Sequence, residues 1–356
     1  MNILIDAYLD RNFGDDIMVE TLIDYLQNNN NCFLIASNEF TYGHILKKFP
    51  KLKIVKSCNK EIIIKNKIEC YIKIGGSMFK HNTIKEGIFR ILEERKFRVL
   101  KKNRVKICIL NCNVGPFKSK IGVRATRRIL KSADLVTCRD KESYEYITNL
   151  RKINTYLLPD IVFSRTDLKQ NIEKDRVLGI SAYTEYLPKI QNCNLSYATA
   201  MAGIANEYLE KIENGKVKIF IFDTNICNDF PTAYEIYNQV KYSDKVEIVP
   251  YMGSTDTFVS EFNKCSVMIG ARFHSIVLAI LCGIPVLPVI YSNKTQNFLD
   301  DMNYNGKTLD FDQCSGTNYA EYAECLIYNS GIYHSIDLDE VSNSCKHFDV
   351  LEKVIL

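Results

Sequence analysis

An arginine and a histidine stand two residues apart where a strand is expected to lead into a helix, within residues 269–275. Ser266–Ile269 is an apolar run of strand length, and Ile276–Cys282 is an apolar run that suits a buried helix. Arg272 offers a planar fork that fits a carboxylate or a phosphate. His274 can carry or release a proton near neutral pH. The two side chains together indicate a site that binds an anion and moves a proton.

The elements around this turn are expected to hold both side chains at one end of a sheet. Gly283 fits the left-handed position that ends a helix, Pro285 prevents continuation, and Val286–Ile290 reads as the next strand. The unpaired N–H groups at the helix start, near Ser275, favour an anion. Arg272 and His274 can converge only if the helix begins at about His274 or later. The alternative is that Arg272 pairs with a surface carboxylate and His274 caps the helix.

A second turn of this kind carries Arg139, which follows the predicted strand Leu135–Cys138 and precedes the predicted helix Lys141–Leu150. By the same argument Arg139 is a candidate anion ligand. Gly75 and Gly76 follow a further strand-like run and would allow a ligand or another part of the chain to approach closely. Neither a phosphate-loop signature nor a dinucleotide-binding glycine pattern is present.

Composition places the chain among ordinary globular proteins. Its 356 residues are 46% hydrophobic and 25% charged, which is enough chain for two domains with real cores. No apolar run is long enough to span a bilayer, and Met1–Ala7 reads as a first strand that meets an acid at once, unlike a signal peptide. The 13 cysteines show no Cys-x-x-Cys spacing. We therefore expect buried reduced thiols in a cytosolic protein and no metal site.

Charge is divided unevenly along the chain. Residues 1–175 hold 33 lysines and arginines against 20 acids, whereas residues 176–356 hold 13 against 22. Between Arg95 and Lys106, seven of twelve residues are basic. This follows a predicted helix, Glu86–Leu100, whose buried side we assign to Ile88, Ile91, Leu92 and Phe97. The basic stretch is either a solvated helix face or a contact with an anionic membrane surface. A nucleic-acid partner is disfavoured, because stacking aromatics and a docking motif are missing.

Strand-like and helix-like runs alternate through both halves of the chain, with a polar stretch near residues 164–175 between them. This pattern predicts an α/β protein with two Rossmann-like parallel-sheet domains, residues 1–172 and 173–356, that face a cleft. Closing helices are expected at the C-terminal end of the second domain. A helix after the turn at residues 12–16 is expected to be capped by Asp15 or Asp16.

In its spaced motifs the sequence resembles the polysaccharide pyruvyl transferase family across nearly the whole chain. The matching residues are Asn12-x-Gly14-Asp15, Gly75-Gly76, Gly115-Pro116, Arg139-Asp140-x-x-Ser143, Pro159-Asp160, Gly270-x-Arg272-x-His274, and Gly283-x-Pro285 followed by Tyr291 and Lys294. Ser77 departs from the pattern, since the family often has a third glycine there. The family resembles two-domain glycosyltransferases of the GT-B type, so the resemblance implies a GT-B-like fold.

The resemblance also implies an activity, the transfer of pyruvate from phosphoenolpyruvate to a sugar of a surface polysaccharide, usually as a cyclic ketal. Phosphoenolpyruvate would serve as donor substrate, with no cofactor and no metal. Its two anionic groups need two cationic clamps, for which Arg139 and Arg272 are the candidates, aided by Ser275. His274 is the candidate general acid, with a pKa that the anionic substrate would hold up.

Further roles remain open among several residues. Lys294 is expected either to steady the leaving phosphate or to be an ordinary exposed lysine. The sugar hydroxyl would lose its proton to Asp15, to Asp160, or to His274 after it has given up its own. Each aspartate has the alternative of capping a helix or holding a turn. Gly75 and Gly76 complete the set of expected substrate-binding residues.

The expected acceptor is a sugar, either in the polysaccharide or on a lipid-diphosphate-linked precursor. The first domain, being basic, is the expected acceptor side, and the second the phosphoenolpyruvate side. We expect a cytoplasmic enzyme with peripheral contact to an anionic inner membrane face and no nucleic-acid partner. Two alternatives compete: a GT-B glycosyltransferase that uses a nucleotide sugar, and a non-catalytic scaffold in polysaccharide assembly.

Overall fold

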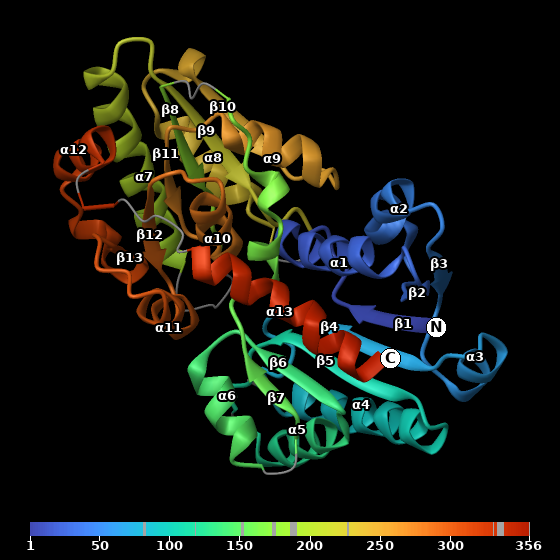
Figure 1. The fold of residues 1–356 in the computed structure, drawn as a ribbon. Helices are drawn as coiled ribbons and strands as arrows, with labels where there is room; N and C mark the ends of the chain where they lie inside the picture. Colours follow the sequence, from blue (N-terminus) through green and yellow to red (C-terminus); the bar gives the residue numbers. More distant parts are fainter. Residues whose placement is uncertain are drawn as a thin grey trace. The chain divides into compact units, whose positions relative to one another are not determined.

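The structure is a computed structural model that describes residues 1–80, 83–117, 119–150, 153–172, 176–185, 191–225, 228–329, 331–332 and 338–355 (Figure 1). Within these residues, helices and strands alternate along the chain, and every strand pairing is parallel. The chain divides into two compact units. Unit 1 comprises residues 1–9, 15–164 and 338–356, and unit 2 comprises residues 10–14 and 165–337.

Unit 1 contains a seven-stranded sheet in the order β3-β2-β1-β4-β5-β6-β7. Its strands are β1 (Asn2–Ala7), β2 (Asn31–Ile35), β3 (Lys53–Val55), β4 (Cys70–Ile74), β5 (Lys106–Cys112), β6 (Leu135–Cys138) and β7 (Thr155–Leu157). Its helices are α1 (Phe13–Leu26, apart from the first two residues), α2 (Glu39–Lys48), α3 (Lys60–Lys65), α4 (Ile84–Lys102), α5 (Lys120–Ser132), α6 (Lys141–Thr148), the 3-10 helix η1 (Ile161–Ser164) and α13 (Leu338–Ile355). The central strands are apolar runs with buried residues on both faces, as in a parallel sheet covered by helices.

Unit 2 contains a six-stranded sheet in the order β10-β9-β8-β11-β12-β13. Its strands are β8 (Val177–Ser181), β9 (Lys216–Ile221), β10 (Val246–Pro250), β11 (Val267–Gly270), β12 (Val286–Ile290) and β13 (Leu309–Asp310). Its helices are α7 (Gln191–Lys211), α8 (Phe230–Gln239), α9 (Thr255–Asn263), α10 (Phe273–Leu281), α11 (Asn293–Asp301) and α12 (Tyr319–Tyr328), with the 3-10 helices η2 (Thr166–Leu168), η3 (Ser243–Lys245) and η4 (Phe311–Gly316).

Strand order reverses direction at one place in each sheet. In unit 1 the reversal lies between β1 and β4, and in unit 2 between β8 and β11. Open parallel sheets bind ligands beyond the carboxyl ends of the strands that flank such a reversal. In unit 2 these ends lead into residues 182–185 and into Ala271-Arg272, so the fold places Arg272 at the position where a ligand is expected.

The two units differ from the expected halves in three places. The chain passes into unit 2 at Arg165, ahead of the expected boundary at 172/173, where residue 173 lies outside the described residues. Residues 10–14 belong to unit 2, because Phe13 packs its ring against Phe222, Tyr251 and Phe258. Helix α13 belongs to unit 1, where it contacts β5, β6 and η1 (Figure 1).

Two helix starts also correct the sequence analysis. Helix α1 begins at Phe13, so Asp15 and Asp16 lie in its first turn and do not cap it. The capping contact comes from Asn12, whose Oδ1 accepts a hydrogen bond from Gly14 N at 2.9 Å. Helix α10 begins at Phe273, three residues before the apolar run at Ile276 and one residue before the limit of about His274 that we set for Arg272 and His274 to converge. It is followed by a left-handed Gly283 (φ 63°), as expected.

The buried side of α4 differs from the one expected. Phe97 is buried and Ile91 is half-buried, but Ile88 and Leu92 are exposed. The helix instead buries a carboxylate, Glu94, which pairs with Arg98 and with Arg128 of α5. Because the hydrophobic pattern alone cannot anticipate a buried carboxylate, we assigned two apolar side chains to the wrong side of the helix.

Candidate active site

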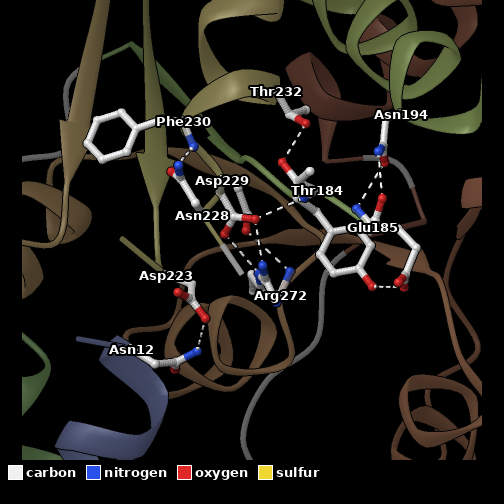
Figure 2. A network of polar contacts seen from close by, with 12 residues as sticks. Asn12, Thr184, Glu185, Asn194, Asp223, Asn228, Asp229, Phe230, Thr232 and Arg272 are labelled. Atoms are coloured by element: carbon white, nitrogen blue, oxygen red, sulfur yellow. Dashed lines mark hydrogen bonds and ion pairs between the residues drawn. The ribbon is translucent and has the colours of Figure 1, made fainter. Parts of the chain in front are cut away.

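Arg272 lies between β11 and α10 in an extended conformation, and its guanidinium is held by one carboxylate. Nε donates to Asp229 Oδ2 at 2.9 Å, and Nη2 donates to Asp229 Oδ1 at 2.5 Å (Figure 2). The Arg272 side chain keeps 15% of its surface exposed, whereas that of Asp229 has none. The pair occupies the Nε–Nη2 edge of the guanidinium, so it fixes the direction of the Nη1 edge.

Asp229 is positioned by helix α8 without capping it. It stands at the N-cap position of α8, yet its side chain makes no capping bond and instead also accepts a hydrogen bond from Thr184 N at 2.9 Å (Figure 2). Burial raises the pKa of Asp229 to about 6, although the charge and hydrogen bonds of Arg272 oppose that rise. Asp229 is therefore a carboxylate whose pairing with Arg272 changes at mildly acidic pH.

Aromatic rings surround the same guanidinium. The Tyr183 ring lies 4.7 Å from the Arg272 guanidinium carbon, and it contacts the Tyr291 ring at 4.3 Å between centroids. The Tyr183 hydroxyl donates to Glu185 Oε2 at 2.7 Å. Burial also raises the pKa of Tyr183, so the hydroxyl stays protonated and the ring stays neutral. These contacts restrict Arg272 to one orientation.

His274 lies directly against Gly14, since a Cβ on Gly14 would overlap the imidazole Nδ1. Gly14 is in turn bonded to Asn12, whose Nδ2 donates to Asp223 Oδ2 at 2.9 Å (Figure 2). The backbone N–H of Asp229 donates to the carbonyl of Asp223. A continuous series of contacts thus links His274 to Arg272 within unit 2.

Ser275 and Lys294 have local partners in the structure. Ser275 is buried, and its hydroxyl donates to the Arg272 carbonyl at 2.5 Å, which fastens the first turn of α10. Lys294 Nζ lies 4.3 Å from the centroid of the Phe273 ring. Ser275 therefore supports the geometry of the turn, and Lys294 lies beside the residue that separates Arg272 from His274.

Arg139 lies between β6 and α6 in unit 1, and its side chain is only 2% exposed. Nε donates to Asn113 Oδ1 at 2.7 Å, and Nη1 is paired with Asp160. The guanidinium lies against Gly76, where a Cβ would overlap Nη2. The close approach that we expected at Gly76 is thus made by an arginine side chain. Gly75 adopts a backbone conformation (φ 152°) that favours glycine.

The carboxylate of Asp160 is occupied by structural contacts. Besides Arg139 it accepts hydrogen bonds from Asn111 Nδ2 at 3.2 Å and from Val162 N at 3.0 Å. Helix α13 closes over the same segment, because Ser344 Oγ donates to the Asp160 carbonyl and His347 Nε2 bonds to the Pro159 carbonyl. These contacts support the alternative in which Asp160 holds a turn.

A third polar cluster in unit 1 was not anticipated. Asp6, at the end of β1, is paired with Lys96 of α4 and bonded to Tyr71, and Lys73 pairs with Glu93 at 2.8 Å. Burial alone would raise the pKa of Asp6, but Lys73 and Lys96 lower it far below its usual value. The cluster neutralises the charges buried between the sheet and α4. The sequence did not predict it, because Asp6 appears there only as a single acid near the end of a strand.

The structure brings the predicted residues together in two groups. Gly76, Arg139 and Asp160 meet in unit 1, while Arg272, Ser275, His274 and Lys294 share one turn and its neighbour in unit 2. Asp15 is half-exposed in the first turn of α1. Their catalytic and binding roles, and the meeting of Arg139 with Arg272 and His274 in one crevice, stay predictions. The sequence analysis did not identify Asp229 as the partner of Arg272. The one indication in the sequence was its position just before the Phe-Pro start of a helix.

The described residues contain no group of three or more His, Cys, Asp or Glu side chains that could hold a metal ion. Among them, too, no helix combines the length and apolar character needed to cross a bilayer. The cysteines that we expected in buried strands and helices, Cys108, Cys265 and Cys282, are buried, and none of these three forms a disulfide.

Solved structures with a similar fold include two UDP-GlcNAc 2-epimerases. The chain is similar to the UDP-GlcNAc 2-epimerase from Neisseria meningitidis bound to UDP-GlcNAc (TM-score 0.63, 11% identity, 100% of each chain covered). It is also similar to the UDP-GlcNAc 2-epimerase from Methanocaldococcus jannaschii (TM-score 0.65, 9% identity, 99% of this chain and 100% of that chain). The likeness to Acinetobacter baumannii MurG is weaker (TM-score 0.54, 10% identity, 99% of both chains). At such identities these matches establish the fold, which confirms two parallel-sheet α/β domains of the GT-B class.

Comparison of sequences is more specific. No curated protein matches the chain significantly. The family model for polysaccharide pyruvyl transferase, however, matches residues 12–293, which span the Asn12–Gly14 turn, both arginine turns and the start of α11. The chain therefore belongs to the polysaccharide pyruvyl transferase family.

Proposed function

We propose that the protein transfers the pyruvyl group of phosphoenolpyruvate to two hydroxyls of one sugar, forming a cyclic ketal in a surface polysaccharide or its lipid-linked precursor. One observation carries the proposal. Arg272 stands at the carboxyl end of β11, where the strand order reverses, with its orientation fixed by Asp229 and with His274 two residues further on. Family membership supports the same activity.

Each group has a role in the proposed reaction. Arg272, whose side chain is 15% exposed, binds one anionic group of phosphoenolpyruvate, whereas Arg139 is enclosed in its pair with Asp160 and supports the fold of unit 1. His274 protonates C3 of the enol, which leaves a cationic C2 for a sugar oxygen to attack. The bond from C2 to the phosphate oxygen then breaks, and a second sugar hydroxyl closes the ketal. Of the two protons lost by the sugar, one balances the proton placed on C3 and the other leaves with inorganic phosphate.

The first experiment uses the purified full chain, phosphoenolpyruvate and a panel of sugar acceptors, including lipid-diphosphate-linked ones. We expect phosphate release together with a mass gain of one pyruvyl group. In D2O the new methyl group should carry one deuterium, because the proton on C3 comes from an exchangeable acid. Release of a nucleotide from UDP- or GDP-sugars, without pyruvylation, would instead favour the glycosyltransferase alternative.

Variants test whether the turn at Arg272 performs this chemistry. Arg272→Lys should lower kcat/KM about 100-fold or more, because an ammonium cannot reproduce the two-edged fork. Arg176→Lys is the matched control, since Arg176 is exposed and precedes β8 at the opposite end of the same sheet. His274→Gln should lower kcat with little change in KM. Unchanged pyruvylation by His274→Ala would contradict the role proposed for His274, whereas a lack of pyruvylation by the unaltered chain would favour the scaffold alternative.

A further inference from the structure

Helix α4 presents apolar side chains to solvent. Ile88, Phe89 and Leu92 are 53%, 58% and 50% exposed. They lie at i, i+1 and i+4 and so share one face of the helix. A helix that buries Glu94 while exposing three large apolar side chains has the reverse of the usual arrangement. Apolar surface gathered in this way marks a contact site.

Helix α5 presents an almost entirely basic face. Its sequence contains no acidic residue. Its exposed residues are Lys120, Ile121, Arg124, Arg127, Arg128 and Lys131. Ile121, 54% exposed, is the one apolar member of that group. All six lie within about 120° of one another around the helix axis, so the face is a stripe of positive charge with an isoleucine at one edge.

The two helices form a single surface. They pack against each other, and Gly87 of α4 lies so close to the start of α5 that a Cβ there would overlap Ser119 Oγ. At this crossing Gly87, next to Ile88, lies against Ser119, which precedes Ile121 by two residues. We define the α4–α5 surface as the following exposed residues of the two helices: Ile88, Phe89, Leu92 and Ile121, with Arg95, Arg124, Arg127, Arg128 and Lys131.

Most acidic groups near this surface are in ion pairs. Glu94 binds Arg98 and Arg128, Glu93 binds Lys73 and Arg90, and Asp134 binds Lys101. Glu86, an exposed acid in the first turn of α4, accepts a hydrogen bond from Thr83 N. Among the described residues, the cations Arg95, Arg124 and Lys131 have no ion-pair partner. The surface therefore keeps a net positive charge around its apolar centre.

We propose that the α4–α5 surface docks on an anionic lipid bilayer, with the four apolar side chains entering the headgroup region and the basic side chains contacting lipid phosphates. Charge complementarity favours this occupant. Each lysine or arginine near an anionic membrane strengthens binding, and exposed phenylalanine, leucine and isoleucine are the side chains that enter the interface. A second copy of the chain fits poorly, because a two-fold contact would place five cations against five cations.

The docking is independent of the proposed pyruvyl transfer, so its test contains neither phosphoenolpyruvate nor sugar. The chain has no tryptophan. Phe89→Trp therefore introduces a unique fluorophore into the surface. We expect its emission to shift to shorter wavelength with vesicles of phosphatidylcholine that contain about 30% phosphatidylglycerol, an anionic lipid, but not with phosphatidylcholine alone. Ile64→Trp is the control, because Ile64 is 58% exposed on α3, outside the surface.

Sedimentation with the same vesicles measures the two components of binding separately. Phe89→Ser should weaken partitioning about tenfold or more, because it removes a large inserted side chain. Ile64→Ser should leave partitioning unchanged. Arg124→Gln combined with Lys131→Gln should weaken binding and reduce its dependence on salt, whereas Lys216→Gln combined with Lys241→Gln changes the same charge elsewhere without that effect.

Three outcomes would overturn the proposal. The first is that the unaltered chain does not bind vesicles containing phosphatidylglycerol, which would leave an acidic protein as the better occupant. The second is equal weakening by Phe89→Ser and Ile64→Ser. The third is an emission shift in Ile64→Trp as large as that in Phe89→Trp. Each variant replaces an exposed side chain, so far-ultraviolet circular dichroism should show an unchanged fold.

Discussion

Arg139 and Arg272 follow a strand in the same way, and each pairs with a buried aspartate. The Arg139 side chain is 2% exposed and its partner Asp160 is fixed by Asn111, Val162 and helix α13. The Arg272 side chain is 15% exposed and lies beside His274 at the reversal of the strand order. The same local pattern thus produces an enclosed ion pair in one unit and a partly open one in the other.

This difference shows that an arginine between a strand and a helix is a candidate ligand for an anionic substrate only if part of its side chain stays exposed after pairing with its carboxylate. Breaking a buried ion pair leaves an uncompensated charge, whereas a partly open one is tuned by solvent and protonation. We therefore expect the Arg139 turn to respond mainly in stability and the Arg272 turn mainly in activity. Four predictions test that contrast, from the largest expected effect to the smallest.

Replacement of each arginine by methionine should separate the two turns most strongly. Arg139→Met leaves Asp160 buried without its cation and should lower the free energy of unfolding by about 3–5 kcal/mol. Arg272→Met should cost about 1–2 kcal/mol at pH 5, since Asp229, with its pKa raised to about 6, can take up a proton there. Urea unfolding at pH 5 measures both, with the exposed Arg176→Met as control. Equal losses at the two positions would refute the contrast.

Helix α13, which covers the Pro159–Asp160 segment beside Arg139, should make the free energy of unfolding depend on pH through its residue His347. Burial lowers the pKa of His347 to about 4, so the unfolded chain, with a value near 6.5, binds more protons between these limits. Stability from this group is therefore complete above pH 6.5 and falls by about 3 kcal/mol as the pH drops to 4.

His347→Gln should remove that part of the slope, about 1.4 kcal/mol per pH unit, while retaining an N–H donor for the Pro159 carbonyl. Urea midpoints of both proteins from pH 4 to 7 provide the measurement. An identical pH slope in the two proteins would show that His347 is protonated in the folded state.

Substitution of two glycines by alanine should have different effects: Gly76→Ala should lower stability, and Gly14→Ala should lower activity. In Gly76→Ala the new Cβ overlaps the buried Arg139 guanidinium, so we expect a loss of about 1–3 kcal/mol in the free energy of unfolding. In Gly14→Ala the Cβ overlaps the His274 ring, so the imidazole should turn away and kcat should fall, with a stability change under about 1 kcal/mol.

Gly43→Ala is the matched control, because the nearest side-chain atom to its added Cβ, in Glu39, lies at an ordinary 3.6 Å. Calorimetry and phosphate release from phosphoenolpyruvate measure the two effects. A large stability loss in Gly14→Ala with full activity would reverse the interpretation.

The smallest expected effect is on the decline of kcat/KM at acidic pH. As the pH falls through about 6, Asp229 gains a proton and loses its charge pairing with Arg272, so activity should decline. Asp229→Asn should lower activity several-fold at pH 8 and flatten this decline, while Asp229→Glu should retain it. The groups that face Asp229 are Arg272, Asp223 and Thr184. A pH profile of kcat/KM that is unchanged in Asp229→Asn would exclude this role.

Much of the fold was predictable because each element carries its own pattern. The strand Val286–Ile290, the left-handed Gly283 and the alternation of both units follow from local residue types. The return of α13 to unit 1 was not predictable, because its partners Pro159 and Asp160 lie about 180 residues earlier in the chain. The exposure of Ile88 and Leu92 on α4 was not predictable either, because the buried Glu94 on the same helix pairs with an arginine from another helix.

The site was predictable only in part. The sequence alone was enough to identify Arg272, His274 and Arg139 as candidates, because each is a polar or charged residue just after an apolar strand. It was not enough to identify their partners, because Asp229 and Asp160 are ordinary acids in the sequence and acquire their environments only when separate segments pack together. Which side of an arginine is left accessible depends on those partners, and so does its function.

Helix α13 has a consequence for how the protein is made. Residues 165–337 leave the ribosome after β5 and β6 but before the helix that covers them. A nascent chain that has completed the six-stranded sheet therefore still lacks the helix that covers β5 and β6 of the seven-stranded sheet. The domain that is translated first is the domain that matures last, and a premature stop near residue 337 would damage the beginning of the protein more than its end.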